Sequence, residues 1–193
     1  MNKPLYLFVG ESASGKTSVA EYFEKEKGMK SVQSYTTRPP RYEGEKGHRF
    51  ISEEEFDKLK NIVAYTVFDG YRYCSTKEQV DDADIYVIDP PGVKTFLEKY
   101  KTEDRTVRII FFDADIRTRI DRMHKRGDSD KSIVNRLYND SKYNWWDETL
   151  QIYTNYLMTI KIDIDNVKLG IYLIDANQNF ESVIKDVLDI IKI

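Results

Sequence analysis

The chain has 193 residues and a formal net charge of -3, from 30 lysines and arginines against 33 aspartates and glutamates. This length suits one α/β domain with small insertions, and the charge excludes a general attraction to nucleic acid or anionic membranes. The single cysteine, Cys74, excludes an internal disulfide, and no apolar run approaches the roughly 18 residues of a membrane span. We therefore expect a cytoplasmic protein, monomeric or homodimeric, without nucleic-acid or membrane partners.

A glycine-rich segment follows the first predicted strand, the apolar run at residues 5–9. Residues 10–17 read G-x-x-x-x-G-K-T and lead into a helix predicted from Lys16 to Lys27, which Gly28 ends. In such a loop the backbone N–H groups turn toward phosphate oxygens, and the start of the helix adds the positive end of its dipole. A chance match is roughly a one-percent event or rarer, so the sequence predicts a site for a nucleoside triphosphate.

Each residue of this loop has an expected role at a bound triphosphate. Lys16 is expected to reach the β- and γ-phosphates, and the Thr17 hydroxyl to bind Mg²⁺. The expected nucleotide-binding residues are Gly10, Ser12, Ser14, Gly15, Lys16, Thr17 and Ser18. ATP and Mg²⁺ are therefore the expected cofactors.

Residues 34–50 differ in composition from the rest of the chain. A second strand is expected just before them, at residues 31–33. Residues 34–50 then contain two prolines, two glycines and three arginines, so we expect a loop there, with neither a helix nor a central strand.

Short helical and extended segments follow this loop. Ser52 and Glu55 form a capping-box pattern that predicts a short helix, and residues 62–68 are β-prone. A turn is expected at Asp69–Gly70. We therefore predict that residues 34–80 form a small α+β insert.

Strands and helices alternate again from residue 84 onward. An apolar run at residues 84–89 predicts a buried strand, and Pro90–Gly92 is expected to break it. Further strands are expected at residues 106–112 and 170–174, and helices at 93–100, 115–126, about 131–143 and 180–191. Residues 147–168 show no clear pattern. The alternation predicts a parallel sheet covered by helices on both faces.

Asp89 ends the buried strand at residues 84–89. Enzymes with a phosphate loop place at such a strand end the acid that holds Mg²⁺ or its water. A carboxylate that caps a turn is the alternative, and the phosphate loop upstream favours the role at the site.

Three arginines share one face of the helix predicted at residues 115–126, namely Arg119, Arg122 and Arg126. A solvated basic face is the simplest interpretation, and we keep it for Arg119. Gly127 and the polar run after it suggest a hinge and a lid, which favours phosphate contacts for Arg126 and Arg136.

The insert carries Ser34-x-Thr36-Thr37-Arg38-x-Pro40-Arg41, followed by Gly44-Glu45 and Gly47. This pattern resembles the nucleoside-monophosphate-binding segment of guanylate kinases. The resemblance continues through Gly70-x-x-Tyr73-x-Ser75-Thr76, Ile88-Asp89-x-x-Gly92-Val93, Arg122-x-x-x-Arg126-Gly127 and Asn135-Arg136-Leu137. It covers roughly residues 5–137. It implies a single P-loop NTPase domain with a three-layer α/β/α parallel sheet, an inserted monophosphate-binding subdomain at 34–80 and a helical lid at about 126–145.

The resemblance also implies individual roles. In that family, the residues matching Arg38, Arg41 and Tyr73 hold the acceptor's phosphate, and the serine matching Ser34 contacts the base. The arginines matching Arg126 and Arg136 touch the transferring phosphoryl group. The residues expected at the site are then Lys16, Arg38, Arg126 and Arg136 for catalysis, Ser34, Arg38, Arg41, Tyr73, Ser75 and Asp89 for the acceptor, and Thr17 and Asp89 for the metal.

Three positions depart from the family pattern. Ala64 stands where the family has a glutamate that accepts hydrogen bonds from guanine, and Val87 replaces an acidic residue two positions before Asp89. His48 stands near the place of a phosphate-binding tyrosine. The base specificity of the family is therefore the implication that this sequence supports least.

The sequence predicts an ATP-dependent nucleoside monophosphate kinase of the guanylate kinase type, with GMP or dGMP as the acceptor. Two alternatives remain open. One is a kinase for another or a modified nucleoside monophosphate, which Ala64 permits. The other is a guanylate-kinase-like module that binds peptides without catalysis, although such a module has no need of a phosphate loop with Lys16 and Thr17.

Overall fold

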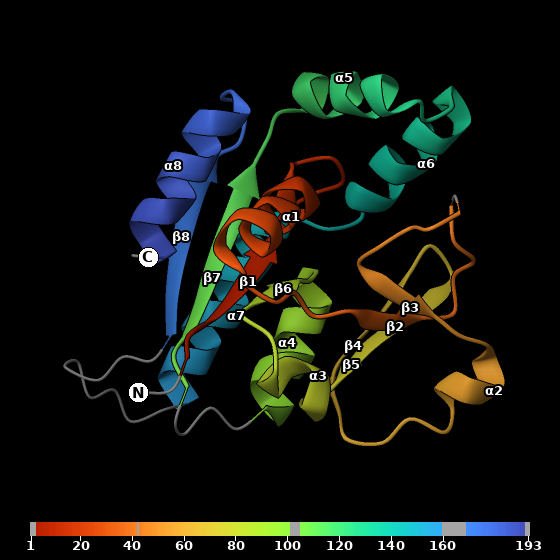
Figure 1. The fold of residues 1–193 in the computed structure, drawn as a ribbon, viewed down its shortest axis with the longest axis vertical. Coiled ribbons are helices and arrows are strands. Elements are labelled where there is room, and N and C mark those ends of the chain that lie inside the picture. The colour runs from red at the N-terminus through yellow and green to blue at the C-terminus, as the bar shows by residue number, and fades with distance from the viewer. Residues whose placement is uncertain (1–2, 42, 101–104, 160–168, 192–193) are drawn as a thin grey trace.

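A four-stranded parallel sheet forms the centre of the molecule (Figure 1). The structure is a computed structural model that describes residues 3–41, 43–100, 105–159 and 169–191. The strand order is β6-β1-β7-β8, with bounds Leu5–Val9 for β1, Ile85–Val87 for β6, Val107–Asp113 for β7 and Leu169–Asp175 for β8. All five residues of β1 are buried, as expected for the interior strand of a parallel sheet with both faces covered.

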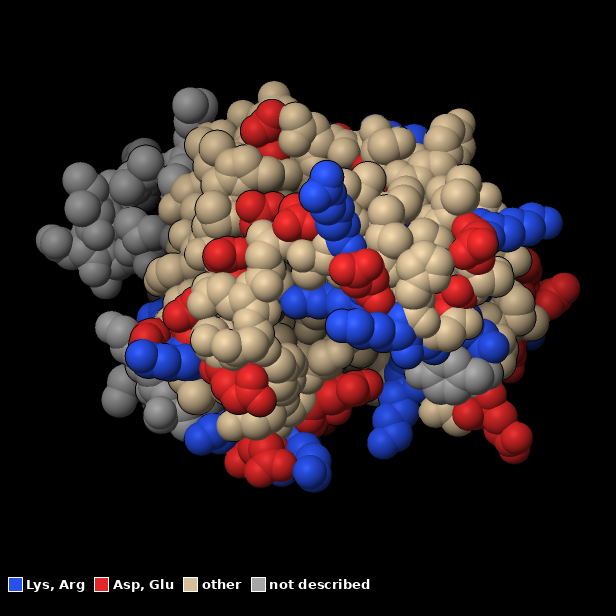
Figure 2. Space-filling view, turned by 90° about the horizontal axis from the view of Figure 1, so that it is seen from above, with Lys and Arg blue, Asp and Glu red and all other residues tan. Residues whose placement is uncertain are grey.

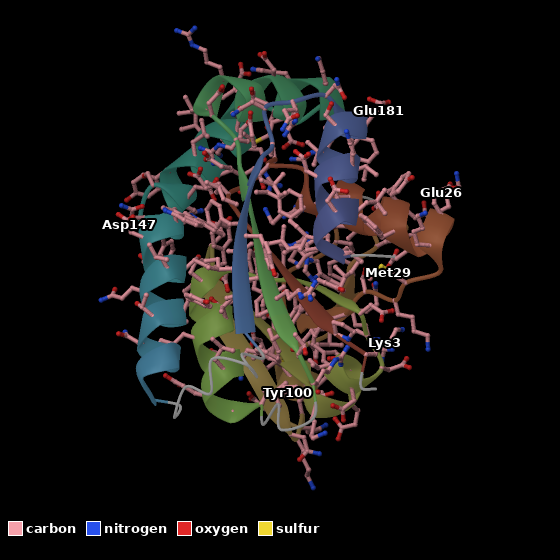
Figure 3. All side chains as sticks on the ribbon, turned by 90° about the vertical axis from the view of Figure 1, so that its left-hand side faces the viewer. Lys3, Glu26, Met29, Tyr100, Asp147 and Glu181 are labelled. Carbon is pink, nitrogen blue, oxygen red and sulfur yellow. The ribbon has the colours of Figure 1, made fainter. Side chains whose placement is uncertain are left out.

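Helices cover both faces of this sheet (Figure 3). On one face lie α1 (Lys16–Lys27) and α8 (Phe180–Ile191), and on the other lie α4 (Pro90–Lys99) and α7 (Trp145–Thr159). Each interface has its own apolar cluster. Phe8, Phe23 and Val187 belong to one cluster, and Leu7 and Phe96 belong to the other. The predicted three-layer α/β/α fold is confirmed.

A second, smaller sheet lies beside the first (Figure 1). Its strand order is β3-β2-β5-β4, with β2 at Ser34–Thr36, β3 at His48–Phe50, β4 at Ile62–Phe68 and β5 at Tyr71–Thr76. It carries two short helices, α2 (Glu53–Phe56) and α3 (Lys77–Asp81). Val63 and Ala64 of β4 share an apolar cluster with Phe96 of α4. The small sheet is therefore packed on the main body through α4.

Two further helices, α5 (Ile116–Arg126) and α6 (Asp130–Asp140), follow β7. They lie beyond the carboxyl end of the main sheet, and α6 descends toward the small sheet (Figure 1). Gly127 joins them in the left-handed conformation, with φ of 87°, which a residue with a Cβ rarely adopts.

Most predicted elements agree with the structure, and the helix at Lys16–Lys27 and the strand at Ile62–Phe68 agree to the residue. The capping box of Ser52 is also confirmed. Among the described residues, no helix is long and apolar enough to cross a membrane.

Three local predictions were wrong. Ser31 makes only an isolated bridge to Ile85, so residues 31–33 form no strand. Residues 34–50 contain β2 and β3, and β2 is an interior strand of the small sheet. The prolines and glycines of that segment lie between the two strands and leave both free to pair.

The third error concerns Pro90 and Pro91. The strand ends before Pro90 as predicted, but α4 begins at Pro90 and not at Val93. Proline is tolerated there because the first residues of a helix have N–H groups without intrahelical partners and proline lacks only that group. Asp89 is the N-cap and accepts a hydrogen bond from Gly92 N at 2.9 Å. The sequence also did not indicate α7, which begins at Trp145.

Candidate functional site

The loop between β1 and α1 has two glycines in backbone conformations that other residues rarely adopt. Gly10 has φ of 148° and Gly15 has φ of 102°. A Cβ atom at Gly10 would lie 2.5 Å from the carbonyl oxygen of Phe112 in β7. The loop can therefore lie against the end of the main sheet only with glycine at this position, and it leads directly into the N-terminus of α1.

Lys16 spans this loop. Its Nζ donates hydrogen bonds to the carbonyl oxygen of Glu11 at 2.7 Å and to Ser14 Oγ at 3.1 Å. Burial lowers the pKa of Lys16 to about 8, and the carboxylate of Asp140 partly opposes this shift. Phosphate oxygens are stronger partners for an ammonium group than a neutral carbonyl oxygen. The side chain is thus held in the loop by two neutral partners that a phosphate could replace.

Arg38 and Tyr73 meet at the small sheet. Arg38 is 7% exposed and donates through Nε to the Tyr73 hydroxyl at 3.2 Å. Its two terminal nitrogens bind the carboxylate of Glu45, with Nη2 to Oε1 at 2.8 Å and Nη1 to Oε2 at 3.2 Å. This bidentate pair fixes the plane of the guanidinium group. Burial alone would raise the pKa of Glu45, but its bonds to Arg38 and Arg41 outweigh burial and lower it.

Arg41 lies in a crowded group of cations. Its Nη1 shares Glu45 with Arg38 at 3.2 Å. Partial desolvation, together with the charges of Arg136 and Arg38, lowers the pKa of Arg41 to about 10. Three guanidinium groups from two parts of the chain are therefore close enough to repel one another, which favours a bound anion among them.

Ser34, the residue predicted to contact the base, lies against His48. Ser34 Oγ lies 2.8 Å from His48 Nδ1, within hydrogen-bond distance. Burial, together with the charge of Arg38, lowers the pKa of His48 to about 4, so the imidazole is neutral at physiological pH. A neutral ring can offer one donor and one acceptor, and Ser34 uses one of them.

Asp89 lies in the same region at the end of β6. Its Oδ2 accepts a hydrogen bond from Thr66 Oγ1 of β4 at 2.8 Å, and its Oδ1 accepts one from Gly92 N at 2.9 Å. Burial raises the pKa of Asp89, although these hydrogen bonds oppose the shift. Asp89 thus joins the phosphate-loop body to the small sheet.

One cavity of about 190 Å³ brings these groups together. We call it the central cavity. Of the residues predicted for the site, it is lined by Gly10, Ser12, Lys16, Ser34, Arg41, Tyr73, Asp89 and Arg136. His48, Thr66, Tyr86 and Trp145 also line it. Residues of the predicted donor site and of the predicted acceptor site therefore face one space.

Arg38 lies next to the central cavity, in the lining of a second cavity of about 590 Å³ between the small sheet and α6. Arg41, Tyr73 and Arg136 line both cavities. Asp128 lines the second cavity and pairs with two arginines: Arg126 Nη2 at 2.5 Å and Arg136 Nε at 3.4 Å. The second cavity thus adjoins the central cavity, and the two share arginines in their linings.

Seven predicted site residues do not line the central cavity: Ser14, Gly15, Thr17, Ser18, Arg38, Ser75 and Arg126. Ser14 and Gly15 belong to the phosphate loop, and Arg38 lines the second cavity. Thr17 and Ser18 are exposed on the first turn of α1, and Ser75 is fully buried. Arg126 is exposed on α5, where it binds Asp128. The roles assigned to all of the predicted site residues stay predictions.

Arg119 contradicts the interpretation of a solvated face. It is 5% exposed, and its Nη1 lies 3.0 Å from Glu11 Oε1 and 3.0 Å from Asp140 Oδ2. Arg122 also points inward and donates to the carbonyl oxygens of Ser14 at 3.1 Å and Ala176 at 2.7 Å. Two arginines of this face, Arg119 and Arg122, therefore contact the phosphate loop, whereas Arg126 binds Asp128. The spacing of this face in the sequence was visible, but its burial depends on where α5 packs.

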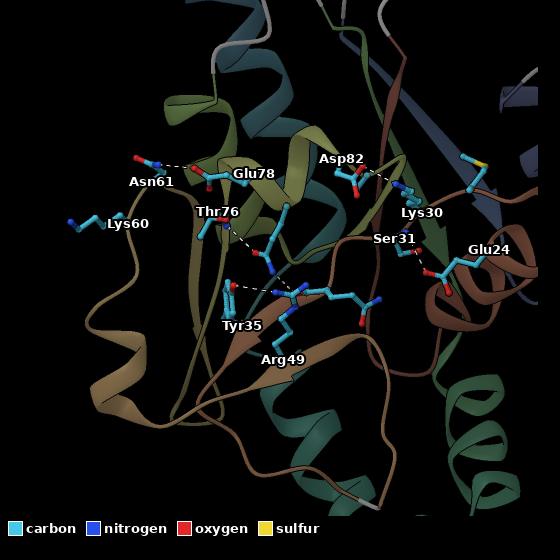
Figure 4. Close-up of a pocket in the computed structure, with 14 residues that line it drawn as sticks. Glu24, Lys30, Ser31, Tyr35, Arg49, Lys60, Asn61, Thr76, Glu78 and Asp82 are labelled. Carbon is cyan, nitrogen blue, oxygen red and sulfur yellow. Dashed lines mark hydrogen bonds and ion pairs between the residues drawn. The ribbon is translucent and has the colours of Figure 1, made fainter.

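A larger cavity of about 740 Å³ lies elsewhere, against α3 and β2 (Figure 4). Several of its charged and polar side chains are paired with one another. Examples are Lys30 with Asp82 at 2.8 Å and Asn61 with Glu78 at 2.7 Å. It contains none of the predicted site residues. Size alone therefore does not identify the site.

The donor set of the central cavity suits Mg²⁺ only together with phosphate. No cluster of three or more His, Cys, Asp or Glu side chains that could hold a metal ion occurs in the described parts of the chain. Mg²⁺ in nucleotide sites is commonly held by one or two protein oxygens, phosphates and water. Each Asp89 oxygen uses one lone pair in the hydrogen bonds above and keeps another. The residues present therefore fit a magnesium ion that arrives with its nucleotide.

Seen from the side of α5 and α6, basic side chains cross the middle of the surface with acidic side chains beside them (Figure 2). Such interleaving agrees with the pairs described above, in which Glu45 and Asp128 each bind two arginines. A continuous basic face of the kind that binds nucleic acid is not seen from this side.

Comparison with solved structures identifies the fold. The chain matches a crystal structure of guanylate kinase from Anaplasma phagocytophilum with a TM-score of 0.53 and 17% sequence identity. The match covers 100% of this chain and 86% of the other. No family model matches the sequence, and no curated protein matches it significantly. The chain thus has the fold of a guanylate kinase at low sequence identity.

Proposed function

We propose that this protein is an ATP-dependent nucleoside monophosphate kinase that converts ATP and a nucleoside monophosphate to ADP and the diphosphate, with GMP or dGMP as the first candidates. The observation that carries the proposal is the central cavity, in which Lys16 of the phosphate loop faces Arg41 and Arg136. The likeness in fold to a guanylate kinase supports it.

The proposed reaction needs little covalent chemistry from the protein. An oxygen of the acceptor's phosphate forms a bond to the γ-phosphorus while the bond from that phosphorus to the bridging oxygen of ADP breaks. The acceptor oxygen is already anionic near neutral pH, so no general base is required. The work of the protein is then to align two anions and to disperse the charge of the transition state.

Different residues of the site would carry out these tasks. Lys16 and the amides at the start of α1 would hold the donor's phosphates. Arg38, Arg41 and Tyr73 would hold the acceptor's phosphate, and Arg136 would reach the group in transit from the side of α6. Thr17 and Asp89 would hold Mg²⁺, which neutralises phosphate charge when it is bound.

A coupled assay of ADP release tests this proposal. ATP and Mg²⁺ are supplied with each common ribo- and deoxynucleoside monophosphate in turn, and Lys16→Ala serves as the inactive control. ADP formation that depends on the added monophosphate is the expected result. If no monophosphate stimulates ADP release from the folded protein, the proposal is wrong and a binding module becomes the better hypothesis.

One observation favours a nucleoside monophosphate other than GMP or dGMP as the acceptor. Ala64 of β4 is 1% exposed and supplies no carboxylate to the central cavity, whereas Asp89, Thr66 and His48 do line it. The polar groups that face the base thus differ from the guanine-reading set that the family resemblance implies. Strong preference for another or a modified nucleoside monophosphate in the same assay would select this alternative.

A further inference from the structure

Arg119 is buried between the phosphate loop and the last residue of α6. It is 5% exposed, and its Nη1 lies 3.0 Å from the carboxylates of both Glu11 and Asp140. Glu11 belongs to the phosphate loop, whereas Asp140 ends α6. One guanidinium group from α5 therefore joins two segments that are 129 residues apart in the sequence (140 minus 11).

Asp140 binds the phosphate loop directly as well. It is 1% exposed, and its Oδ2 accepts a hydrogen bond from the backbone N–H of Ser12 at 3.0 Å. Its Oδ1 accepts one from Ser12 Oγ, also at 3.0 Å. The indole N–H of Trp145 donates to the carbonyl oxygen of Asp140 at 3.1 Å, which fixes the end of α6 from the other side.

Arg119 supplies one of the two positive charges that balance the two carboxylates beside the phosphate loop. Glu11 and Asp140 are acidic, and Lys16 and Arg119 are basic. Without Arg119, one buried carboxylate (Asp140) and one half-buried carboxylate (Glu11) would lie beside a loop that is proposed to bind a polyanion, and Lys16 would be the one cation of this group of four left to oppose them. Burial already raises the pKa of both Glu11 and Asp140, and the Arg119 charge opposes the shift in each case.

We propose that Arg119 and Asp140 are positioning residues of the donor site, which hold the Glu11–Ser12 part of the phosphate loop in its binding conformation by tying it to α6. The proposal rests on the proposed function for the identity of the ligand. Neither residue needs to touch the nucleotide. Arg119 acts through Glu11 and Asp140, and Asp140 acts through Ser12.

A double-mutant cycle tests this role. Arg119→Gln, Asp140→Asn and the double variant are compared with two control variants on exposed positions of α5, Arg117→Gln and Asp121→Asn. Calorimetry measures the affinities for ATP and for a nucleoside monophosphate. Hydrogen exchange measures protection of the Ser12 amide without any nucleotide, and thermal unfolding confirms that each variant is folded.

Each single substitution at the pair is expected to weaken ATP binding by about tenfold, since a buried charged hydrogen bond is lost. The double variant should weaken it no more than the worse single variant, because the two residues act as one unit. The affinity of each variant for the monophosphate should differ from that of the wild type by less than about twofold. The Ser12 amide should exchange faster in every variant of the pair and at the wild-type rate in both controls.

The proposal is overturned if Arg119→Gln behaves like Arg117→Gln, or if the single effects multiply in the double variant. Should Arg119→Gln fail to fold, Arg119→Lys keeps the charge and loses the planar fork, so an intermediate effect on ATP affinity and amide exchange is expected. Neither readout needs turnover. A wild type that binds ATP but phosphorylates no monophosphate would contradict the proposed function while the cycle still decides the role of the pair.

Discussion

At the scale of single residues, the arginines of the site already have acidic partners. Glu45 binds Arg38 and Arg41, and Asp128 binds Arg136. Such partners fix the guanidinium groups and limit their mutual repulsion before a substrate binds. A phosphate that enters the site must therefore compete with these carboxylates, and the selectivity of each arginine depends on the acid beside it.

The first prediction concerns Lys16. Lys16→Ala is expected to lower turnover by at least about a hundredfold, because one preorganised charge at the developing phosphoryl anion contributes roughly 3 kcal/mol. Steady-state kinetics on the purified variant measure the loss, and circular dichroism checks the fold. Turnover near the wild-type value in a folded variant would remove the loop from the mechanism.

The second prediction separates acceptor from donor binding. Arg38→Ala should weaken the monophosphate by about ten- to a hundredfold, the value of a lost charged hydrogen bond, and should leave ATP affinity nearly unchanged. Arg49→Ala is the control, since Arg49 is an exposed arginine of the same small sheet. Calorimetry with each ligand makes the comparison, and a loss of ATP affinity in Arg38→Ala would contradict the assignment.

At the scale of elements, β4 forms part of the wall of the central cavity. Ala64 pairs in register with Ser75 of β5, and neither has more than 1% of its surface exposed. Thr66, two residues along the strand, reaches the central cavity and binds Asp89. The carboxylate beside β4 in the central cavity is therefore Asp89, which follows β6, and β4 itself supplies none.

The third prediction follows from this arrangement. Ala64→Glu should raise kcat/KM for GMP or dGMP by about tenfold, because guanine offers donors that a new carboxylate can accept. Val67→Glu places the same side chain at an exposed position of β4 and should have no such effect. Steady-state kinetics with purine and pyrimidine monophosphates measure it. A strong wild-type preference for a pyrimidine, unchanged by Ala64→Glu, would refute a guanine site.

The fourth prediction concerns the predicted lid at about residues 126–145, which contains α6 and begins at the last residue of α5. Arg136→Ala and Arg126→Ala should lower kcat more than they change either KM, because contacts completed on closure act mainly in the transition state. Lys125→Ala, exposed on the same helix as Arg126, is the control. If instead both KM values rise at unchanged kcat, these arginines bind ground-state substrate and the lid assignment is wrong.

At the scale of the whole molecule, the end of α6 contacts both parts of the site. Asn139 donates to Asp69, at the tip of the β4–β5 hairpin, at 2.9 Å. The next residue, Asp140, binds Ser12 in the phosphate loop. Two consecutive side chains thus connect α6 to the small sheet and to the main sheet, so a movement of α6 would affect both substrate sites.

The fifth prediction concerns stability against pH. The pKa of His48 is about 4 in the folded protein and 6.5 ordinarily, so the unfolded chain binds more protons between these values. The stability due to neutral His48 is complete above pH 6.5 and is lost as the pH falls toward 4. Urea unfolding should show that wild type loses stability faster across this window than His48→Gln. His124→Gln, at an exposed position, should follow wild type.

Local features of the chain determined the phosphate loop and most of the elements. The phosphate loop is a contiguous segment from Gly10 to Thr17, and its glycines determine the local backbone conformation. The pattern could therefore be recognised directly in the sequence. The strand at residues 62–68 and the helix ended by Gly28 follow from periodicity and capping, which also act over a few residues.

Only the tertiary structure decided which charges meet. Ser12 and Asp140 are 128 residues apart, so no local pattern could pair them. Arg38 and Tyr73 are 35 residues apart and could be grouped only through the family resemblance. The burial of Arg119 likewise depends on how α5 packs over the loop. The spacing of arginines along a helix shows that they share a face, but it does not show whether that face meets water or a carboxylate. The partner is set by packing between segments that are distant in the sequence.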